Sequence, residues 1–234
     1  MTDTAIILAG GFGTRLQSVV SDLPKPMADI GGKPFLQYLL IYLKSFGIKR
    51  VILCTGYLHE KVEAHFGSNF LGIEIIYSRE ESPLGTGGAI KKAMKHVEGN
   101  CFILNGDSFF EIDLRALSSF HETSNADFTF GLKQMSEFDR YGTVVLELDS
   151  IVAFKEKTYM RSGLINSGVY VTSSKIFSTL KLPDSFSLEK DFLEKQIGSM
   201  NILGMISEGY FIDIGIPEDY ERAISEMPFM TIFN

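Results

Sequence analysis

The sequence is poor in the features that mark secreted, membrane-spanning and nucleic-acid-binding proteins. Its only two cysteines, Cys54 and Cys101, lie inside apolar runs, which is typical of reduced core residues in a cytoplasmic protein. No apolar run approaches the roughly 20 residues of a transmembrane helix, and no basic signal-peptide segment precedes Ala5. Acidic residues outnumber basic ones by 29 to 22, which argues against a large nucleic-acid surface. We therefore expect a cytoplasmic protein that binds neither nucleic acid nor membranes.

Two further absences narrow the chemistry. The four histidines do not have the spacing of metal ligands, and no Ser/His/Asp or Cys/His set indicates a covalent mechanism. With 45% hydrophobic and 22% charged residues, the composition is that of a globular enzyme. The length of 234 residues suits one large domain. A site for an anionic ligand must then be a local positive pocket in an acidic protein.

The N-terminal stretch carries the clearest pattern in the chain. The apolar run Ala5–Leu8 predicts a buried parallel strand, and three glycines follow it within residues 10–13. Backbone N–H groups that no side chain covers can form a concavity for anions. Arg15, and Lys25 between two prolines, add the positive charge that suits a polyphosphate.

This loop is not one of the standard phosphate-binding motifs. A P-loop requires a lysine directly after its last glycine, and none follows Gly13. The dinucleotide fingerprint requires a third glycine where Leu16 stands. A purely structural turn between a strand and a helix is the alternative, but such a turn needs neither Arg15 nor Lys25. The stretch therefore predicts nucleotide chemistry.

Strand-like and helix-like segments alternate in the first half of the chain. This alternation indicates a parallel sheet with helices on both faces. The expected strands are Ala5–Leu8, Arg50–Thr55, Ile73–Tyr77 and Cys101–Asn105, and the expected helices are Lys33–Phe46, His59–Phe66 and Ala89–Val97.

From about Leu114 the expected strands follow one another closely, so part of the sheet is mixed or antiparallel. The expected strands are Asp127–Leu132, Thr143–Leu148, Ile151–Lys155, Asn166–Thr172, Asn201–Met205 and Tyr210–Ile212, and the expected helices are Leu114–Glu122, Ser174–Thr179, Leu188–Ile197 and Pro217–Glu226. The apolar end, Met227–Phe233, is expected to pack on the body of the protein, with a second subunit as the alternative. The fold class is α/β, with a mixed, mostly parallel central sheet flanked by helices, and residues 1–234 are expected to form a single domain.

Two aspartates follow predicted strands. Asp107 comes after the strand that ends at Asn105, and Asp213 comes after the segment Tyr210–Ile212. In an open α/β sheet, ligands bind beyond the carboxyl ends of the strands. Mg²⁺ takes one or two carboxylates, with waters and phosphate oxygens completing its shell. The two aspartates are therefore candidate metal ligands, and the alternative is that each one caps a following turn or helix.

Two other segments offer groups to a ligand. The glycine-rich turn Gly85–Gly88 can let its backbone approach a flat ring closely, although an ordinary loop with a glycine cap is the alternative. Glu156 and Asn166 offer acceptors and donors for sugar hydroxyls, and Lys157 offers a cation for a phosphate. The alternative for residues 155–157 is a solvated charged surface.

Taken together, these segments resemble the sugar-1-phosphate nucleotidyltransferases. The family pattern Gly-Gly-x-Gly-Thr-Arg-Leu, then Pro-Lys-Pro-Met, is matched by residues 10–16 and 24–27, and the resemblance extends from Ala5 to about Tyr220. Further matching segments are Pro83–Ala89, Leu104–Ser108, Phe154–Lys157 and Ile165–Tyr170. The resemblance is greatest to guanylyltransferases that act on D-glycero-D-manno-heptose 1-phosphate, and next to those that act on mannose 1-phosphate. It implies a Rossmann-like, GT-A-like fold with a nucleotide-binding half, residues 1–113, and a sugar-phosphate-binding half, residues 114–234.

The resemblance also implies roles for single residues. Those implied to bind the nucleotide are Leu8, Ala9, Gly10, Gly11, Gly13, Thr14, Arg15, Lys25, Glu80, Gly85 and Thr86. Those implied to bind the sugar phosphate are Gly142, Glu156, Lys157 and Asn166. The implied catalytic residues are Arg15, Lys25 and Asp107, and the implied Mg²⁺ ligands are Asp107 and Asp213. Many relatives carry proline where Ser18 or Val19 stands and tryptophan where Phe211 stands, but neither departure removes a charged group.

A preference for guanine can also be argued from the chemistry of the base itself. The Watson–Crick edge of guanine presents two adjacent donors, N1–H and the 2-amino group, and one carboxylate can accept both. Glu80, just before the second glycine turn, is suitably placed if that turn holds the base, and Glu81 is the alternative.

We therefore expect an Mg²⁺-dependent enzyme that transfers GMP from GTP to a sugar 1-phosphate and releases pyrophosphate, for cell-surface polysaccharide synthesis. The resemblance favours the heptose 1-phosphate, with mannose 1-phosphate or another hexose 1-phosphate as the alternative, and a homodimer is possible. A glycosyltransferase would instead use a finished nucleotide-sugar and usually an Asp-x-Asp motif, which does not occur near Asp107. A non-catalytic nucleotide sensor has no need of the full set of charged residues.

Overall fold

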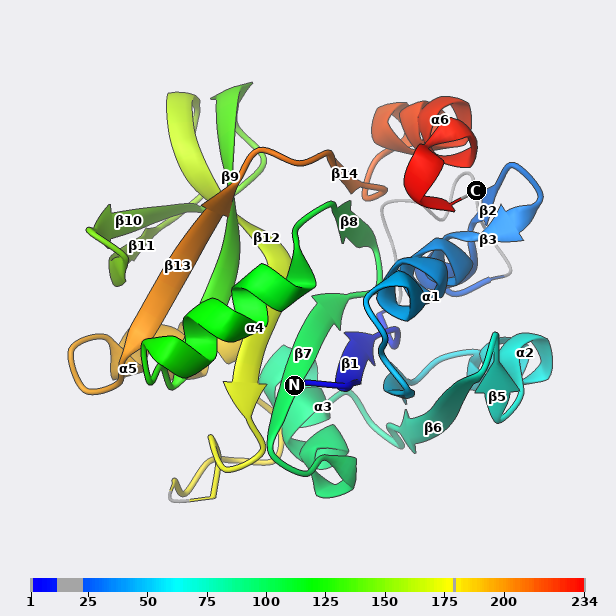
Figure 1. The fold of residues 1–234 in the computed structure, drawn as a ribbon, viewed down its shortest axis with the longest axis horizontal. Helices are drawn as coiled ribbons and strands as arrows, with labels where there is room; N and C mark the ends of the chain where they lie inside the picture. The colour runs from blue at the N-terminus through cyan, green and yellow to red at the C-terminus, as the bar shows by residue number, and fades with distance from the viewer. Residues whose placement is uncertain (1, 12–22, 179, 234) are drawn as a thin grey trace.

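The computed structural model describes residues 2–11, 23–178 and 180–233, and a ten-stranded sheet forms its centre (Figure 1). In chain order, the strands of this sheet are β1 (Thr4–Leu8), β4 (Arg50–Thr55), β5 (Asn69–Phe70), β6 (Ile73–Arg79), β7 (Asn100–Asn105), β9 (Phe128–Phe138), β10 (Thr143–Glu147), β11 (Ser150–Lys155), β12 (Met160–Ser173) and β13 (Ile202–Ser207). They lie side by side in the order β10-β11-β13-β9-β12-β7-β1-β4-β6-β5. Two separate ribbons pair β2 (Asp29–Ile30) with β3 (Lys33–Pro34) and β8 (Ser108–Phe110) with β14 (Phe211–Asp213).

The parallel part of the sheet consists of β7, β1, β4 and β6, with β1 between β7 and β4. Residues 4–7 of β1 are all buried, because helices cover both faces of the sheet at this point. A strand that is covered on both faces is apolar throughout instead of alternating, as the sequence predicts for this run. The carboxyl ends of these four strands meet at one edge, where a ligand is expected.

The other part of the sheet is largely antiparallel. Strand β12 pairs antiparallel with both β7 and β9, and β10 and β11 form an antiparallel pair, whereas β13 runs parallel to β9. The predicted mixed central sheet is confirmed, but "mostly parallel" holds for the N-terminal half alone. The short connections after residue 138 allow only antiparallel neighbours, because a parallel crossover needs a dozen or more residues.

Helices cover both faces of the sheet. The α-helices are α1 (Phe35–Ser45), α2 (His59–Phe66), α3 (Gly85–Ala93), α4 (Leu114–Thr123), α5 (Glu194–Gln196) and α6 (Pro217–Glu226). The tighter or wider turns are η1 (Lys25–Met27), η2 (Met94–His96), the π-helical η3 (Leu188–Leu193), η4 (Met227–Phe229) and η5 (Thr231–Phe233). Side chains of α1, α2, α4, α6 and the C-terminal turns form one core, and those of α3, η2 and η3 form the other.

The glycine-rich turn differs from its prediction. Gly85–Gly88 is the first turn of α3 and not a loop before it. Its N–H groups at Gly87 and Gly88 both donate to the carbonyl oxygen of Phe186, at 3.0 and 3.4 Å. A Cβ on Gly87 would lie 2.2 Å from the Phe186 ring. The glycines therefore serve close packing between α3 and the segment before η3, a reason that local sequence patterns do not reveal.

Two helices predicted in the second half of the chain also differ from the structure. Residues 174–178 form successive turns instead of a helix, and the neighbouring apolar residues Ile176 and Phe177 are both buried. The predicted helix Leu188–Ile197 is divided into the π-helical η3 and the short α5.

The C-terminal segment packs on the body of the protein, as predicted. The Phe233 ring packs edge-to-face with Tyr38 and at a tilt against Phe109, at centroid distances of 4.9 and 5.1 Å. Figure 1 shows α6 beside the β2–β3 ribbon, and the Tyr220 hydroxyl donates a hydrogen bond to Asp29 O at 2.7 Å. Cys54 and Cys101 are buried free thiols. In the described part of the chain, no helix has the length and apolar character needed to cross a membrane.

Candidate active site

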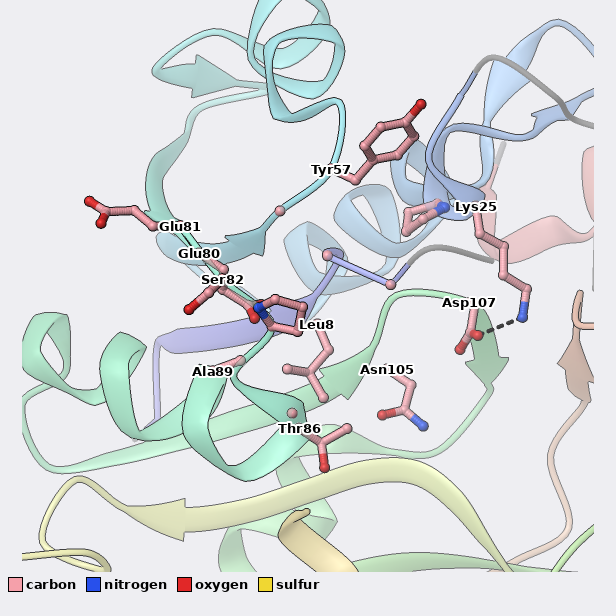
Figure 2. A pocket seen from close by; sticks show the side chains of 16 residues that line it. Leu8, Lys25, Tyr57, Glu80, Glu81, Ser82, Thr86, Ala89, Asn105 and Asp107 are labelled. Carbon is pink, nitrogen blue, oxygen red and sulfur yellow. Dashed lines mark hydrogen bonds and ion pairs between the residues drawn. The ribbon is translucent and has the colours of Figure 1, made fainter. Parts of the chain in front are cut away.

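A cavity of about 670 Å³ lies at the carboxyl ends of the parallel strands (Figure 2). Its lining includes Gly10 and Gly11 after β1, Tyr57 after β4, Glu80 after β6 and Asp107 after β7. Small-molecule sites have volumes of about 300–1,000 Å³, so the cavity has the size of a nucleotide site. Figure 2 shows Lys25 and Asp107 at one end, Glu80 and Ser82 toward the other, and Leu8 between them.

A lysine and two carboxylates meet at the first of these ends. Lys25 Nζ lies 2.6 Å from Asp107 Oδ2 and 3.7 Å from Asp213 Oδ1. The Lys25 side chain is only 13% exposed, so its charge is partly shielded from water and acts strongly on nearby groups. The predicted catalytic and metal-binding residues 25, 107 and 213 are thus brought together, although 188 residues separate the first from the last.

Backbone hydrogen bonds explain why Asp107 and Asp213 lie close together. In the β8–β14 ribbon Asp213 pairs with Ser108, and Ile214 N–H donates to Asp107 O at 3.0 Å. Gly106 N–H donates to Leu8 O at 3.0 Å, and a Cβ on Gly106 would lie 2.4 Å from the same oxygen. Only glycine permits this approach, which holds the turn that carries Asp107 against the end of β1.

Arg140 is a neighbour of this cluster that the sequence analysis did not place. Its guanidinium lies 2.7 Å from Asp219 at the start of α6 and 4.0 Å from Asp213 Oδ2. It also lies over the Tyr141 ring, 5.4 Å from the centroid. Because its partners are far away in the chain, only the folded structure reveals them.

The two carboxylates fit a divalent cation. Asp213 Oδ1 is buried and has no hydrogen-bond partner among the described residues, which is an unusual state for a carboxylate oxygen. Burial, and next the negative charge of Asp107, raise the pKa of Asp213, while Lys25 and Arg140 act in the opposite direction. No group of three or more His, Cys, Asp or Glu side chains within the described ranges could hold a metal ion. Two carboxylates are, however, what Mg²⁺ takes when phosphates and waters complete its shell.

Glu80 lies in the wall of the cavity, as expected for a base-facing residue. Its Oε2 accepts a hydrogen bond from Leu84 N–H at 3.0 Å, and its Oε1 faces Gly10. Burial raises the pKa of Glu80, although the Leu84 N–H works against that shift. One acceptor site of Oε2 therefore braces the loop that leads to α3, and the carboxylate has further acceptor sites on both oxygens for a ligand.

Gly85 and Thr86 line the same cavity from the first turn of α3. The Thr86 hydroxyl accepts a hydrogen bond from Leu188 N–H at 2.8 Å and donates one to Glu189 at 3.4 Å. Its oxygen is thus tied to η3.

The four residues expected to face the sugar lie outside the cavity lining. Glu156 pairs with Lys190 at 2.8 Å on the surface, and Lys157 is exposed beside it. Asn166 lies on β12, where its amide donates to the Tyr170 hydroxyl at 2.8 Å. Gly142 lies before β10, opposite Lys155 O. Their roles stay predictions.

The phosphate loop is described only in part. Leu8, Gly10 and Gly11 line the cavity, and Ala9 is buried with its N–H bonded to Cys54 O at 2.8 Å. Gly13, Thr14 and Arg15 lie outside the described residues. Tyr57, which the sequence analysis missed, also lines the cavity, and its position after a strand is the signal that marks it.

The fold and the site together define a class of protein. Residues 4–228 match the family model described as Nucleotidyl transferase, so the chain belongs to that family. A curated relative named D-glycero-alpha-D-manno-heptose 1-phosphate guanylyltransferase, from Aneurinibacillus thermoaerophilus, is 54% identical over 95% of this chain and 97% of its own. A relative of the same name from Campylobacter jejuni is 48% identical over 92% of this chain and 96% of its own.

Solved structures agree with this family. HddC from Yersinia pseudotuberculosis superposes with a TM-score of 0.86 at 38% identity, and the match covers 97% of this chain and 100% of HddC. The same protein complexed with GMP-PN gives a TM-score of 0.85. The predicted family, fold class and nucleotidyltransferase activity are therefore confirmed.

The position of Asp213 predicts how stability depends on pH. Because its pKa is raised in the folded state, the protonated form is favoured there, and stability falls as pH rises above the unfolded pKa and through the folded pKa. In EDTA at pH 7, Asp213→Asn should therefore be more stable to urea than the parent protein, and the difference should shrink toward pH 4.

The control for this comparison is Asp219→Asn, which removes the carboxylate closest to Arg140 and should lower stability at pH 7. A gain for Asp213→Asn that does not depend on pH, or a loss at pH 7, would contradict the electrostatic account of Asp213.

Proposed function

We propose that this enzyme transfers GMP from GTP to D-glycero-α-D-manno-heptose 1-phosphate, giving GDP-heptose and pyrophosphate. The observation that carries the proposal is the Lys25–Asp107–Asp213 cluster at one end of a nucleotide-sized cavity. The names of the two curated relatives support the sugar, and the GMP-PN complex of HddC supports guanine. The product is a glycosyl donor, which suits cell-surface polysaccharide synthesis.

The reaction needs charge neutralisation more than proton transfer. An oxygen of the sugar 1-phosphate attacks the α-phosphorus of GTP, a new P–O bond forms, and pyrophosphate leaves with the electrons of the broken P–O bond. A phosphate monoester has a second pKa near about 6, so its oxygen is already ionised at pH 7 and no strong general base is required. The barrier comes from bringing two anions together in line.

The residues at the cavity end are suited to lower this barrier. Lys25 places a fixed, partly buried positive charge where the α-phosphate and the sugar phosphate meet, and Arg15 adds charge from the N-terminal loop. Asp107 and Asp213 would hold Mg²⁺, which when bound supplies further positive charge to the phosphate oxygens. Asp213 Oδ1, buried and without a hydrogen-bond partner among the described residues, supports this assignment.

The remaining site residues would bind either the base or the sugar phosphate. Glu80 would accept N1–H and the 2-amino group of guanine at the far end of the cavity, with Gly85 and Thr86 beside the base. Gly142, Glu156, Lys157 and Asn166 would bind the sugar phosphate. Residues 1–113 would then bind the nucleotide and residues 114–234 the sugar phosphate, within one domain. We also propose that the protein is cytoplasmic and can form homodimers.

A substrate panel tests the proposed function. Heptose and mannose 1-phosphates, each combined with GTP, ATP, CTP or UTP, should release pyrophosphate fastest for heptose 1-phosphate with GTP. Faster release with mannose 1-phosphate would reassign the sugar, and the absence of release from every pair would contradict a nucleotidyl transfer function.

Base recognition by Glu80 gives a separate prediction. Replacing the carboxylate by an amide removes one of its two acceptors and weakens a charge-assisted pair, which should reduce the GTP-over-ATP preference in kcat/KM about tenfold or more. The measurement is kcat/KM for both nucleotides in Glu80→Gln.

The matched control is Glu81→Gln, since Glu81 lines the same cavity but is exposed. An unchanged preference in Glu80→Gln would reject its role, and a loss confined to Glu81→Gln would transfer the role to Glu81.

A further inference from the structure

A chain of hydrogen bonds centred on Glu189 joins two parts of the site. Glu189 lies on η3, and neither the motifs nor the cavity lining identify it. Its Oε1 accepts from the Tyr170 hydroxyl at 3.2 Å. Its Oε2 accepts from the hydroxyls of Thr86 and Ser187, both at 3.4 Å. Three elements, β12, α3 and η3, thus meet at one carboxylate.

The chemistry of these groups sets the direction of each hydrogen bond. An ionised carboxylate can only accept, so the Tyr170 hydroxyl must donate to Glu189. Burial, and next the charge of Glu189, raise the pKa of Tyr170 well above its ordinary value, which keeps this proton in place. The phenol oxygen is then an acceptor for its other neighbour, the Asn166 amide nitrogen at 2.8 Å.

Asn166 is therefore held in one of its two amide orientations. Its Nδ2 faces Tyr170, and its Oδ1 accepts from Gly168 N–H at 3.0 Å. An amide has two N–H groups, so one remains to be donated in a fixed direction. A Cβ on Gly168 would lie 2.5 Å from the amide nitrogen of Asn105, which lines the cavity, so this turn packs against the cavity wall.

The local structure holds Glu189 in position. Ser187 Oγ accepts from Lys190 N–H at 3.3 Å, and Ser187 N–H donates to Asp191 at 2.8 Å, which caps η3. Leu188 N–H donates to Thr86 Oγ1 at 2.8 Å and ties the same turn to α3. Single π-helical turns are rare and are frequent at functional sites.

We propose that Glu189 is a positioning residue that fixes the Asn166 amide through Tyr170 and ties it through Thr86 to the nucleotide-binding start of α3. The inference rests on the proposed function, in which Asn166 binds the sugar phosphate. Glu189 does not touch the reacting atoms, and its effect reaches them through the orientation of Asn166.

Steady-state kinetics of Glu189→Gln and Tyr170→Phe test this role. The amide introduced by the first substitution can donate as well as accept, and the ring left by the second can do neither, so both variants weaken the restraint that Tyr170 places on the Asn166 amide and leave the Gly168 N–H bond to orient it alone. We expect KM for the sugar 1-phosphate to rise about tenfold in each. The Leu188 N–H bond still ties Thr86 to η3 in both variants, so kcat and KM for GTP should stay within about twofold of the parent protein. The double variant should be no worse than the more affected single variant, because both act through Asn166.

The matched control is Glu194→Gln, an exposed carboxylate on the neighbouring α5, which should leave all three constants unchanged. If Glu189→Gln does not fold, as judged by thermal denaturation, Tyr170→Phe decides the question. If Glu189→Gln and Tyr170→Phe have the same KM for the sugar phosphate as Glu194→Gln, the proposal is overturned.

NMR of the Asn166 side-chain amide separates this inference from the proposed function. In the parent protein its two Nδ2 protons, identified by their loss in Asn166→Asp, should be well separated, because one is bonded to Tyr170. The separation should shrink in Glu189→Gln and Tyr170→Phe, and an unchanged separation would overturn the positioning role. Failure of the parent protein to form GDP-heptose would reject the proposed function alone, since the amide signals do not depend on turnover.

Discussion

The contact of Lys25 with Asp107, beside the buried carboxylate of Asp213, is the constraint on which the rest of the site depends. Like charges this close destabilise the fold unless a cation lies near them, and the partly buried ammonium of Lys25 is that cation. The ribbon of β8 and β14 and the glycine turn at residue 106 hold the two carboxylates in place. The proposed reaction needs the same charges.

In the proposed function, the two substrates bind at different parts of the sheet. The parallel strands end at the cavity that Gly10, Gly11 and Glu80 line, which is where we propose that the nucleotide binds. Strand β12, which carries Asn166, pairs with β7 through residues 169–173, so the two parts belong to one continuous sheet. Glu189 adds a second connection, from β12 through η3 to α3. In the proposed reaction, a single fold thereby holds two anionic substrates in a fixed relation.

Much of this could be predicted from local patterns. β4, α2 and α6 have the predicted bounds, because an apolar run, a helical period and a proline at the first turn mark them. Asp107 and Asp213 could be placed at strand ends, and the structure brings them together. Arg140 and Glu189 could not be assigned, since their partners lie far away in the chain and only tertiary contacts bring them close. The glycines at 85–88 indicated a loop, whereas close packing against Asp184 and Phe186 explains them.

The central claim is that the charge of Lys25 acts on the reacting phosphates, and the turnover of Lys25→Met tests it most directly. Methionine keeps most of the side-chain volume and removes the charge. The account predicts a fall in kcat of about 10²–10³-fold, as for other groups that stabilise developing charge, with the protein still folded. Lys44→Met, on the exposed side of α1, should leave kcat unchanged. A folded Lys25→Met enzyme with near-parental kcat would contradict the account.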